Sequence, residues 1–106
     1  MNDNTIKNVI DFRDDRDWKK YHNGKDLAIS ISFEANELLE IYQWSNTDLD
    51  RNEKKEHIKE ELADVLIYSI MMADYYNLDL DDIINEKLKK NLIKYPKNKK
   101  VDLTKK

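Results

Sequence analysis

The segment FEANELLEIYQW, residues 33–44, predicts a helix in which acidic and apolar side chains share one face. At about 100° per residue, Glu34 falls in the middle of the apolar stripe that contains Leu38 and Ile41. Glu37 lies beside Ile41 on the same side of the helix. Carboxylates are rarely buried without a partner, so this face requires a compensating group.

The next helical segment repeats this pattern. Residues 62–73, LADVLIYSIMMA, are apolar on almost every side and carry Asp64 as their only charge. Glu61 precedes Asp64 by three residues, as Glu34 precedes Glu37, and side chains at that spacing reach the same side of a helix. A helix that is apolar all round in so short a chain also predicts a subunit interface.

An antiparallel pair of these helices would bring the four carboxylates together. Each buried ion costs several kcal/mol, whereas a whole domain is stable by only about 5–15 kcal/mol, so a cation must balance the cluster. An all-oxygen ligand set suits Mg²⁺, or Mn²⁺, better than Zn²⁺. The alternative is that each carboxylate lies at the margin of its stripe and reaches water. Two such pairs on consecutive helices favour the metal site.

Helices are expected along most of the 106 residues, because Gly24 and Pro96 are the only glycine and proline. We predict an all-α fold, a four-helix bundle that forms one domain over residues 1–96. The expected helices span about residues 5–21, 27–44, 51–77 and 80–95. Their expected N-terminal caps are Asp26, Asp50 with Glu53, and Asp79. Residues 97–106, KNKKVDLTKK, are expected to form a basic, flexible tail.

Charge and composition exclude several classes of protein. Residues 1–96 carry 14 basic and 21 acidic side chains, which argues against duplex nucleic acid as the main ligand. No apolar run approaches the roughly 20 residues that span a bilayer, so no membrane association is expected. Without a readable signal peptide or any cysteine, the chain is expected in the reducing cytoplasm.

The fourth predicted helix carries polar side chains on its apolar face. Lys87, Asn91 and Lys94 share that face with Ile83 and Ile84. Lysine stems often cover apolar surface while their ammonium groups reach solvent. The functional interpretation is that these groups contact an anion that the metal also contacts, as a polyphosphate ligand requires.

Aromatic residues near the carboxylates could stack on a base. The candidates are Trp18, Trp44 and Tyr68, although aromatic residues at helical spacing more often belong to an ordinary core. His22 is a further candidate, and the alternative is that it is a structural or exposed histidine.

Glu34-x-x-Glu37 followed by Glu61-x-x-Asp64 resembles the motif of the MazG-like all-α nucleoside triphosphate pyrophosphohydrolases. Within this superfamily the chain looks most like the single-domain dCTP pyrophosphatase-like proteins. The resemblance covers about residues 9–96 and rests on the segments FRDDRDW, KDLAISISFEANELLEIYQW, EELADVLIYSIMMA and NLIKYP.

The resemblance implies cleavage of a nucleoside triphosphate between the α- and β-phosphates, which yields a monophosphate and pyrophosphate. It implies four Mg²⁺ ligands at Glu34, Glu37, Glu61 and Asp64. It also implies nucleotide contacts at Trp18, His22, Trp44, Tyr68 and Asn91, with Lys87 and Lys94 near the phosphates. The family assembles as dimers or tetramers through the central helices, so a homo-oligomer is expected.

The chemistry leaves the general base open between Glu34 and Glu37. Two other functions compete with the hydrolase. A di-iron centre typically needs Glu-x-x-His pairs, and neither histidine follows a glutamate at that spacing. A non-catalytic helical interaction module would show no change in stability when a divalent metal is added, whereas the hydrolase would be stabilised by metal and nucleotide.

Overall fold

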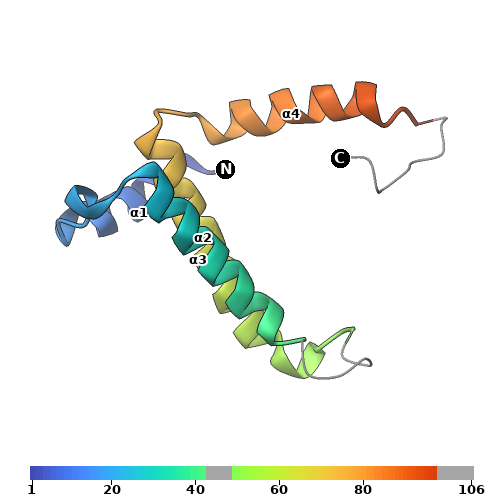
Figure 1. Ribbon diagram of the computed structural model, residues 1–106, viewed down its shortest axis with the longest axis horizontal. Coiled ribbons are helices and arrows are strands. Elements are labelled where there is room, and N and C mark those ends of the chain that lie inside the picture. Colours follow the sequence, from blue (N-terminus) through green and yellow to red (C-terminus); the bar gives the residue numbers. More distant parts are fainter. Residues whose placement is uncertain (43–48, 98–106) are drawn as a thin grey trace.

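The computed structural model describes residues 1–42 and 49–97. Over these residues the chain is helical and contains no strand, which confirms the all-α prediction. The described residues form the α-helices α1 to α4, which are labelled in Figure 1. Their bounds are α1 Asp3–Asp15, α2 Gly24–Glu40, α3 Lys55–Tyr75 and α4 Leu80–Lys94. Two short 3₁₀ helices, Lys19–Tyr21 and Asn52–Lys54, precede α2 and α3.

Helices α2 and α3 pack side by side as an antiparallel pair and form the centre of the molecule (Figure 1). The best buried apolar side chains belong to this pair and its ends: Leu27, Ile41, Ile70, Met71 and Ala73. Burial of large apolar side chains such as Leu27 and Met71, each 1% exposed, supplies the main favourable term for this packing. The pair is therefore the rigid element on which a site can be built.

Helix α2 begins three residues earlier than the sequence suggested, so Asp26 as its N-cap was wrong. The cap is Asn23, whose side chain accepts a hydrogen bond of 2.8 Å from the backbone N–H of Asp26. A Cβ on Gly24 would lie 1.9 Å from the hydroxyl oxygen of Tyr76. Any larger residue at this position would require the Tyr76 side chain to move.

The first helix is shorter than predicted and ends at Asp15 rather than near residue 21. Asp17 then adopts a left-handed backbone with φ 56°, and a 3₁₀ turn follows it. This turn sets the Trp18 ring edge-on to Phe12, with 5.4 Å between ring centroids. No glycine or proline marks the break, which is why the sequence pattern missed it.

The predicted cap of the third helix at Asp50 and Glu53 was also wrong. Helix α3 begins at Lys55, after the 3₁₀ turn, and no side chain caps it. Glu53 instead pairs with Arg51 across that turn. At its other end α3 stops at Tyr75, shortly before Asn77 adopts φ 55°.

The start and end of the fourth helix agree with the prediction. Asp79 caps α4 by accepting a hydrogen bond of 3.0 Å from the backbone N–H of Asp82. The helix ends at Lys94, two residues before Pro96. The second predicted helix was expected to reach residue 44, but α2 ends at Glu40.

Helix α4 leaves the end of the α2–α3 pair and runs away from it (Figure 1). Its apolar side chains are largely exposed, with Ile93 at 83%. Leu62 and Leu66 on α3 are also exposed. No helix in the described part of the chain is long and apolar enough to cross a membrane. Residues 98–106, most of the expected tail, lie outside the described residues.

Candidate metal centre

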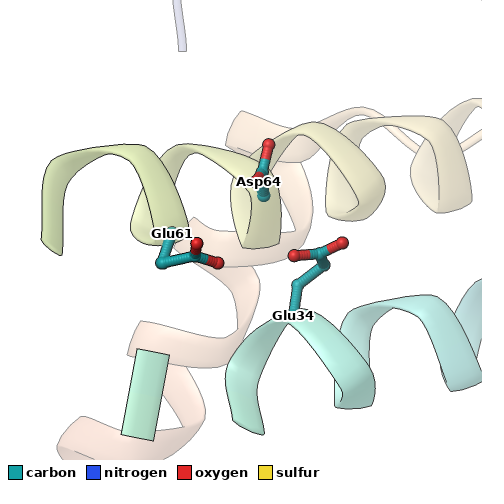
Figure 2. A group of neighbouring side chains, drawn as sticks. All are labelled: Glu34, Glu61 and Asp64. Carbon is teal, nitrogen blue, oxygen red and sulfur yellow. The ribbon is translucent and has the colours of Figure 1, made fainter. Parts of the chain in front are cut away.

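Three of the four predicted carboxylates meet between α2 and α3. Glu34 comes from α2, and Glu61 and Asp64 come from successive turns of α3 (Figure 2). One carboxylate oxygen from each lies within 4.8 Å of the other two, and all three residues are half-buried. We call these three residues the acidic cluster. The i, i+3 spacing on α3 points both of its members toward Glu34.

The acidic cluster carries an unbalanced negative charge. Burial raises the pKa of Glu34 above its ordinary value, and the neighbouring carboxylates of Asp64 and Glu61 raise this pKa further. Glu37 adds a smaller effect in the same direction. Because like charges repel, a bound cation would favour the ionised form of Glu34.

One carboxylate oxygen of Glu61 is buried without a hydrogen-bond partner in the described chain. Its side chain is 13% exposed, and its Oε2 atom is buried without a hydrogen-bond partner among the described residues. The other oxygen, Oε1, lies 3.4 Å from Nε2 of His57. A buried carboxylate oxygen without a donor costs free energy, and a metal ion would remove that cost. Three converging carboxylates fit a hard divalent cation such as Mg²⁺ or Mn²⁺.

The fourth predicted ligand, Glu37, lies beside the acidic cluster rather than in it. Its side chain lines a cavity of about 310 Å³ at the end of α2. We call this the cationic cavity, because three of its lining residues are basic or can become so. Its lining residues are Glu37, Glu40, Ile41, Arg51, Lys54 and His57. The role of Glu37 as a metal ligand stays a prediction.

A second cavity, of about 360 Å³, lies at the other end of α2. It brings together three predicted nucleotide contacts, Trp18, His22 and Tyr68. We call it the aromatic cavity; its remaining lining residues are Tyr21, Asp26, Leu27 and Ser30. The sequence analysis missed these four, although Ser30 precedes Glu34 by four residues and so shares its face.

The surroundings of His22 favour its neutral form. Burial lowers the pKa of His22 below its ordinary value, and the positive charge of Arg13 lowers it further. Its Nδ1 atom is buried and has no hydrogen-bond partner in residues 1–42 or 49–97. A neutral histidine keeps one ring nitrogen as an acceptor, so it can recognise a donor on a ligand.

Of the remaining predicted contacts, three lie on α4 and one lies outside the described residues. Trp44 lies outside the described residues. Lys87 lines a shallow cavity of about 280 Å³ with apolar residues of α4. Asn91 is half-buried, and Nζ of Lys94 lies 5.3 Å from the centre of the Tyr95 ring. All three of these residues belong to α4, which runs away from the α2–α3 pair (Figure 1), so their roles stay predictions.

Comparisons with known proteins agree with this architecture. A model of the MazG-like family matches residues 29–106. Two proteins named dCTP pyrophosphatase 1, from Mus musculus and Homo sapiens, are each 32% identical to the chain over 91 and 92 residues. Each alignment covers 81% of this chain and 54% of the relative. The chain thus spans about half the length of these curated relatives.

A solved structure resembles the fold closely. It is the crystal structure of a pyrophosphatase from Archaeoglobus fulgidus, 40% identical in sequence, with a TM-score of 0.82. The match covers 89% of this chain and 91% of that one, so it includes most of the described helices.

Proposed function

The chain belongs to the MazG-like family, and we propose that it is a divalent-metal-dependent nucleoside triphosphate pyrophosphohydrolase. It cleaves the α–β phosphoanhydride of its substrate and releases a nucleoside monophosphate and pyrophosphate. One observation carries this proposal: the buried Oε2 of Glu61, which has no hydrogen-bond partner in the described chain, lies within a group of three carboxylates. Such a cluster is suited to hold a metal ion against a polyphosphate.

The acidic cluster holds the metal in this proposal. Glu34, Glu61 and Asp64 would hold a divalent ion, which would neutralise charge on the phosphoryl oxygens and make water a better nucleophile. Water adds its oxygen to a phosphorus of the α–β anhydride, and the bridging P–O bond breaks with its electron pair on the departing phosphate. The proton of the water passes to a carboxylate. Glu37 is our candidate for this base, because it borders the acidic cluster without being one of its members.

The aromatic cavity is our candidate for the nucleoside. Trp18 and Tyr68 supply ring faces on which a base can stack, and neutral His22 supplies a ring nitrogen for hydrogen bonding. The names of the curated relatives favour dCTP or a related deoxynucleotide. We expect Mg²⁺ as the metal, with Mn²⁺ as a substitute.

A homo-oligomer, a dimer or a tetramer, is also part of the proposal. Exposed apolar side chains on α3 and α4, among them Leu62, Leu66 and Leu92, support it. Exposed apolar patches of this kind mark interaction surfaces. Light scattering coupled to size-exclusion chromatography measures the mass directly, and a monomer would contradict this part.

The function is tested by measuring pyrophosphate release from a panel of ribo- and deoxynucleoside triphosphates. Each assay is run with Mg²⁺ and again with EDTA. We expect metal-dependent release from one or a few deoxynucleotides. No release from any nucleotide by a folded protein, together with no effect of Mg²⁺ on its stability, would favour a non-catalytic interaction module instead.

A further inference from the structure

The two cavities lie on opposite sides of the acidic cluster along the α2–α3 pair. On α2, Ser30 of the aromatic cavity precedes Glu34 by one turn, and Glu37 of the cationic cavity follows Glu34. Because α3 runs antiparallel to α2, its residues follow the same spatial order with decreasing residue number. From the aromatic cavity onward its residues are Tyr68, Asp64, Glu61 and His57. Residues spaced three or four apart on a helix share one face, so the three features form one continuous track.

The cationic cavity holds two basic side chains, Arg51 and Lys54, that can contact an anion. Arg51 donates a hydrogen bond of 3.1 Å from its guanidinium to the carbonyl of Ile41, which fixes this side chain at the end of α2. Lys54 lies in the short turn that leads into α3. His57 lines the cavity and also approaches Glu61, so the cavity opens directly beside the acidic cluster. Glu37 and Glu40 also line the cavity, so its two permanent positive charges, on Arg51 and Lys54, are matched in number by two carboxylates.

The two cavities differ in the part of a nucleotide that they suit. Rings of Trp18, Tyr21 and Tyr68 line the aromatic cavity, which suits a base. Guanidinium and ammonium groups line the cationic cavity, which suits phosphate. From Ser30 to Glu40 the helix rises about 15 Å at 1.5 Å per residue, comparable to the length of an extended nucleoside triphosphate.

We infer that the cationic cavity binds the two phosphates that leave as pyrophosphate, with Lys54 and Arg51 as their contacts. The substrate then lies along the α2–α3 pair, with its nucleoside in the aromatic cavity and its α–β bond at the acidic cluster. This inference rests on the proposed function and adds the orientation in which the substrate lies along the α2–α3 pair. It assigns the phosphate contacts to the turn before α3, where sequence reasoning had placed them at Lys87 and Lys94 of α4.

The experiment compares two lysine variants. Lys54→Gln removes a charge from the cationic cavity and leaves the start of α3 without a lost hydrogen bond, because no side chain caps that helix. Lys59→Gln is the matched control, since this exposed lysine on α3 pairs with Glu56 at 3.6 Å and does not line the cavity. For each protein, calorimetry measures the affinity for pyrophosphate in Mg²⁺, and steady-state assays measure inhibition by pyrophosphate and by the nucleoside monophosphate.

We expect Lys54→Gln to weaken pyrophosphate binding about tenfold, the loss of one charge-assisted contact, while inhibition by the monophosphate stays unchanged. Lys59→Gln should match the wild type in both measurements. Equal pyrophosphate affinity in all three proteins would overturn the inference. So would equal weakening by both variants, which would indicate a general effect of net charge. Nucleotide cleavage by the wild type tests the proposed function separately: cleavage supports it, and no cleavage of any nucleotide contradicts it. Whatever that result, the pyrophosphate affinities of the three proteins test whether the cationic cavity binds pyrophosphate.

Discussion

Two regions of this small protein bury charged side chains, and they differ in whether opposite charges of the chain compensate for the lost hydration. Arg13, 2% exposed, bonds to Asp74 at 2.7 Å and to Asp14 at 2.9 Å. Its charge is therefore balanced within the chain. Glu61 instead faces Glu34 and Asp64, which have the same sign, and one of its oxygens has no donor in the described structure.

The difference separates a structural charge from a functional one. Arg13 joins α1 to the far end of α3, and its neighbouring turn positions Trp18. Removing its charge should therefore affect folding. The acidic cluster opposes folding unless a cation is bound, so removing one of its charges should affect activity and leave the fold intact. Proteins commonly accept such local costs at functional sites.

The largest effect is expected for Glu61→Gln. Loss of a ligand that positions the metal should lower turnover about a thousandfold, or roughly 4 kcal/mol of transition-state stabilisation. Without metal, the variant should unfold at the same or higher urea concentration than the wild type, because a like charge is gone. Pyrophosphate release and urea titration in EDTA measure these two quantities. Glu60→Gln is the control, because Glu60 is an exposed neighbour on the same helix. Wild-type turnover by a folded Glu61→Gln protein would remove the metal assignment.

Glu37→Gln sharpens the distinction between metal ligand and base. Since Glu37 lies outside the acidic cluster, we expect kcat to fall about a hundredfold while the affinity for Mn²⁺ stays within about twofold. Steady-state kinetics and Mn²⁺ binding separate the two roles. A parallel loss of Mn²⁺ affinity would show that Glu37 is a ligand, as the sequence motif suggests.

Arg13→Met tests the structural side of the comparison. It removes two charge-assisted hydrogen bonds from a buried site, so the free energy of unfolding should fall by about 2 kcal/mol. Arg16→Met is the matched control, because Arg16 is exposed and its guanidinium stacks 3.6 Å from the centre of the Phe12 ring. That variant should lose less than about 1 kcal/mol. If urea titrations show equal losses in the free energy of unfolding for both variants, the buried ion pairs of Arg13 do not stabilise the fold more than an exposed arginine does.

The smallest expected effect concerns His22, whose pKa both burial and Arg13 lower in the folded protein. As pH falls, the unfolded chain takes up the histidine proton before the folded chain does. The free energy of unfolding should therefore decrease below neutral pH and recover as pH rises through the ordinary histidine range. His22→Asn should flatten that part of the profile between about pH 5 and pH 7. An unchanged slope in urea titrations would contradict this account of His22.

Sequence periodicity was sufficient for the parts of the molecule that local spacing governs. The i, i+3 pairs placed Glu34, Glu61 and Asp64 on inward faces, and the structure brings these three together. Asp79 and Pro96 bounded the fourth helix because caps and prolines act within a few residues.

Features that depend on distant contacts could not be found in this way. Arg13 looks like any surface arginine until Asp74, on another helix, is placed beside it. Asn23, not Asp26, caps α2, and Gly24 beside it lies close to the Tyr76 side chain, a contact that no local pattern records. Likewise, the cationic cavity joins the end of α2 to the start of α3, so its lining residues are not periodic in the sequence.

We expect Glu34, Glu61 and Asp64 together to bind a divalent cation. Titration of the nucleotide-free protein with Mn²⁺, followed by the loss of the free-ion electron paramagnetic resonance signal, tests it most directly. We predict that the wild type and Glu60→Gln bind Mn²⁺ with equal affinity and that Glu61→Gln loses most of this binding. Equal Mn²⁺ affinity in all three proteins would contradict the account.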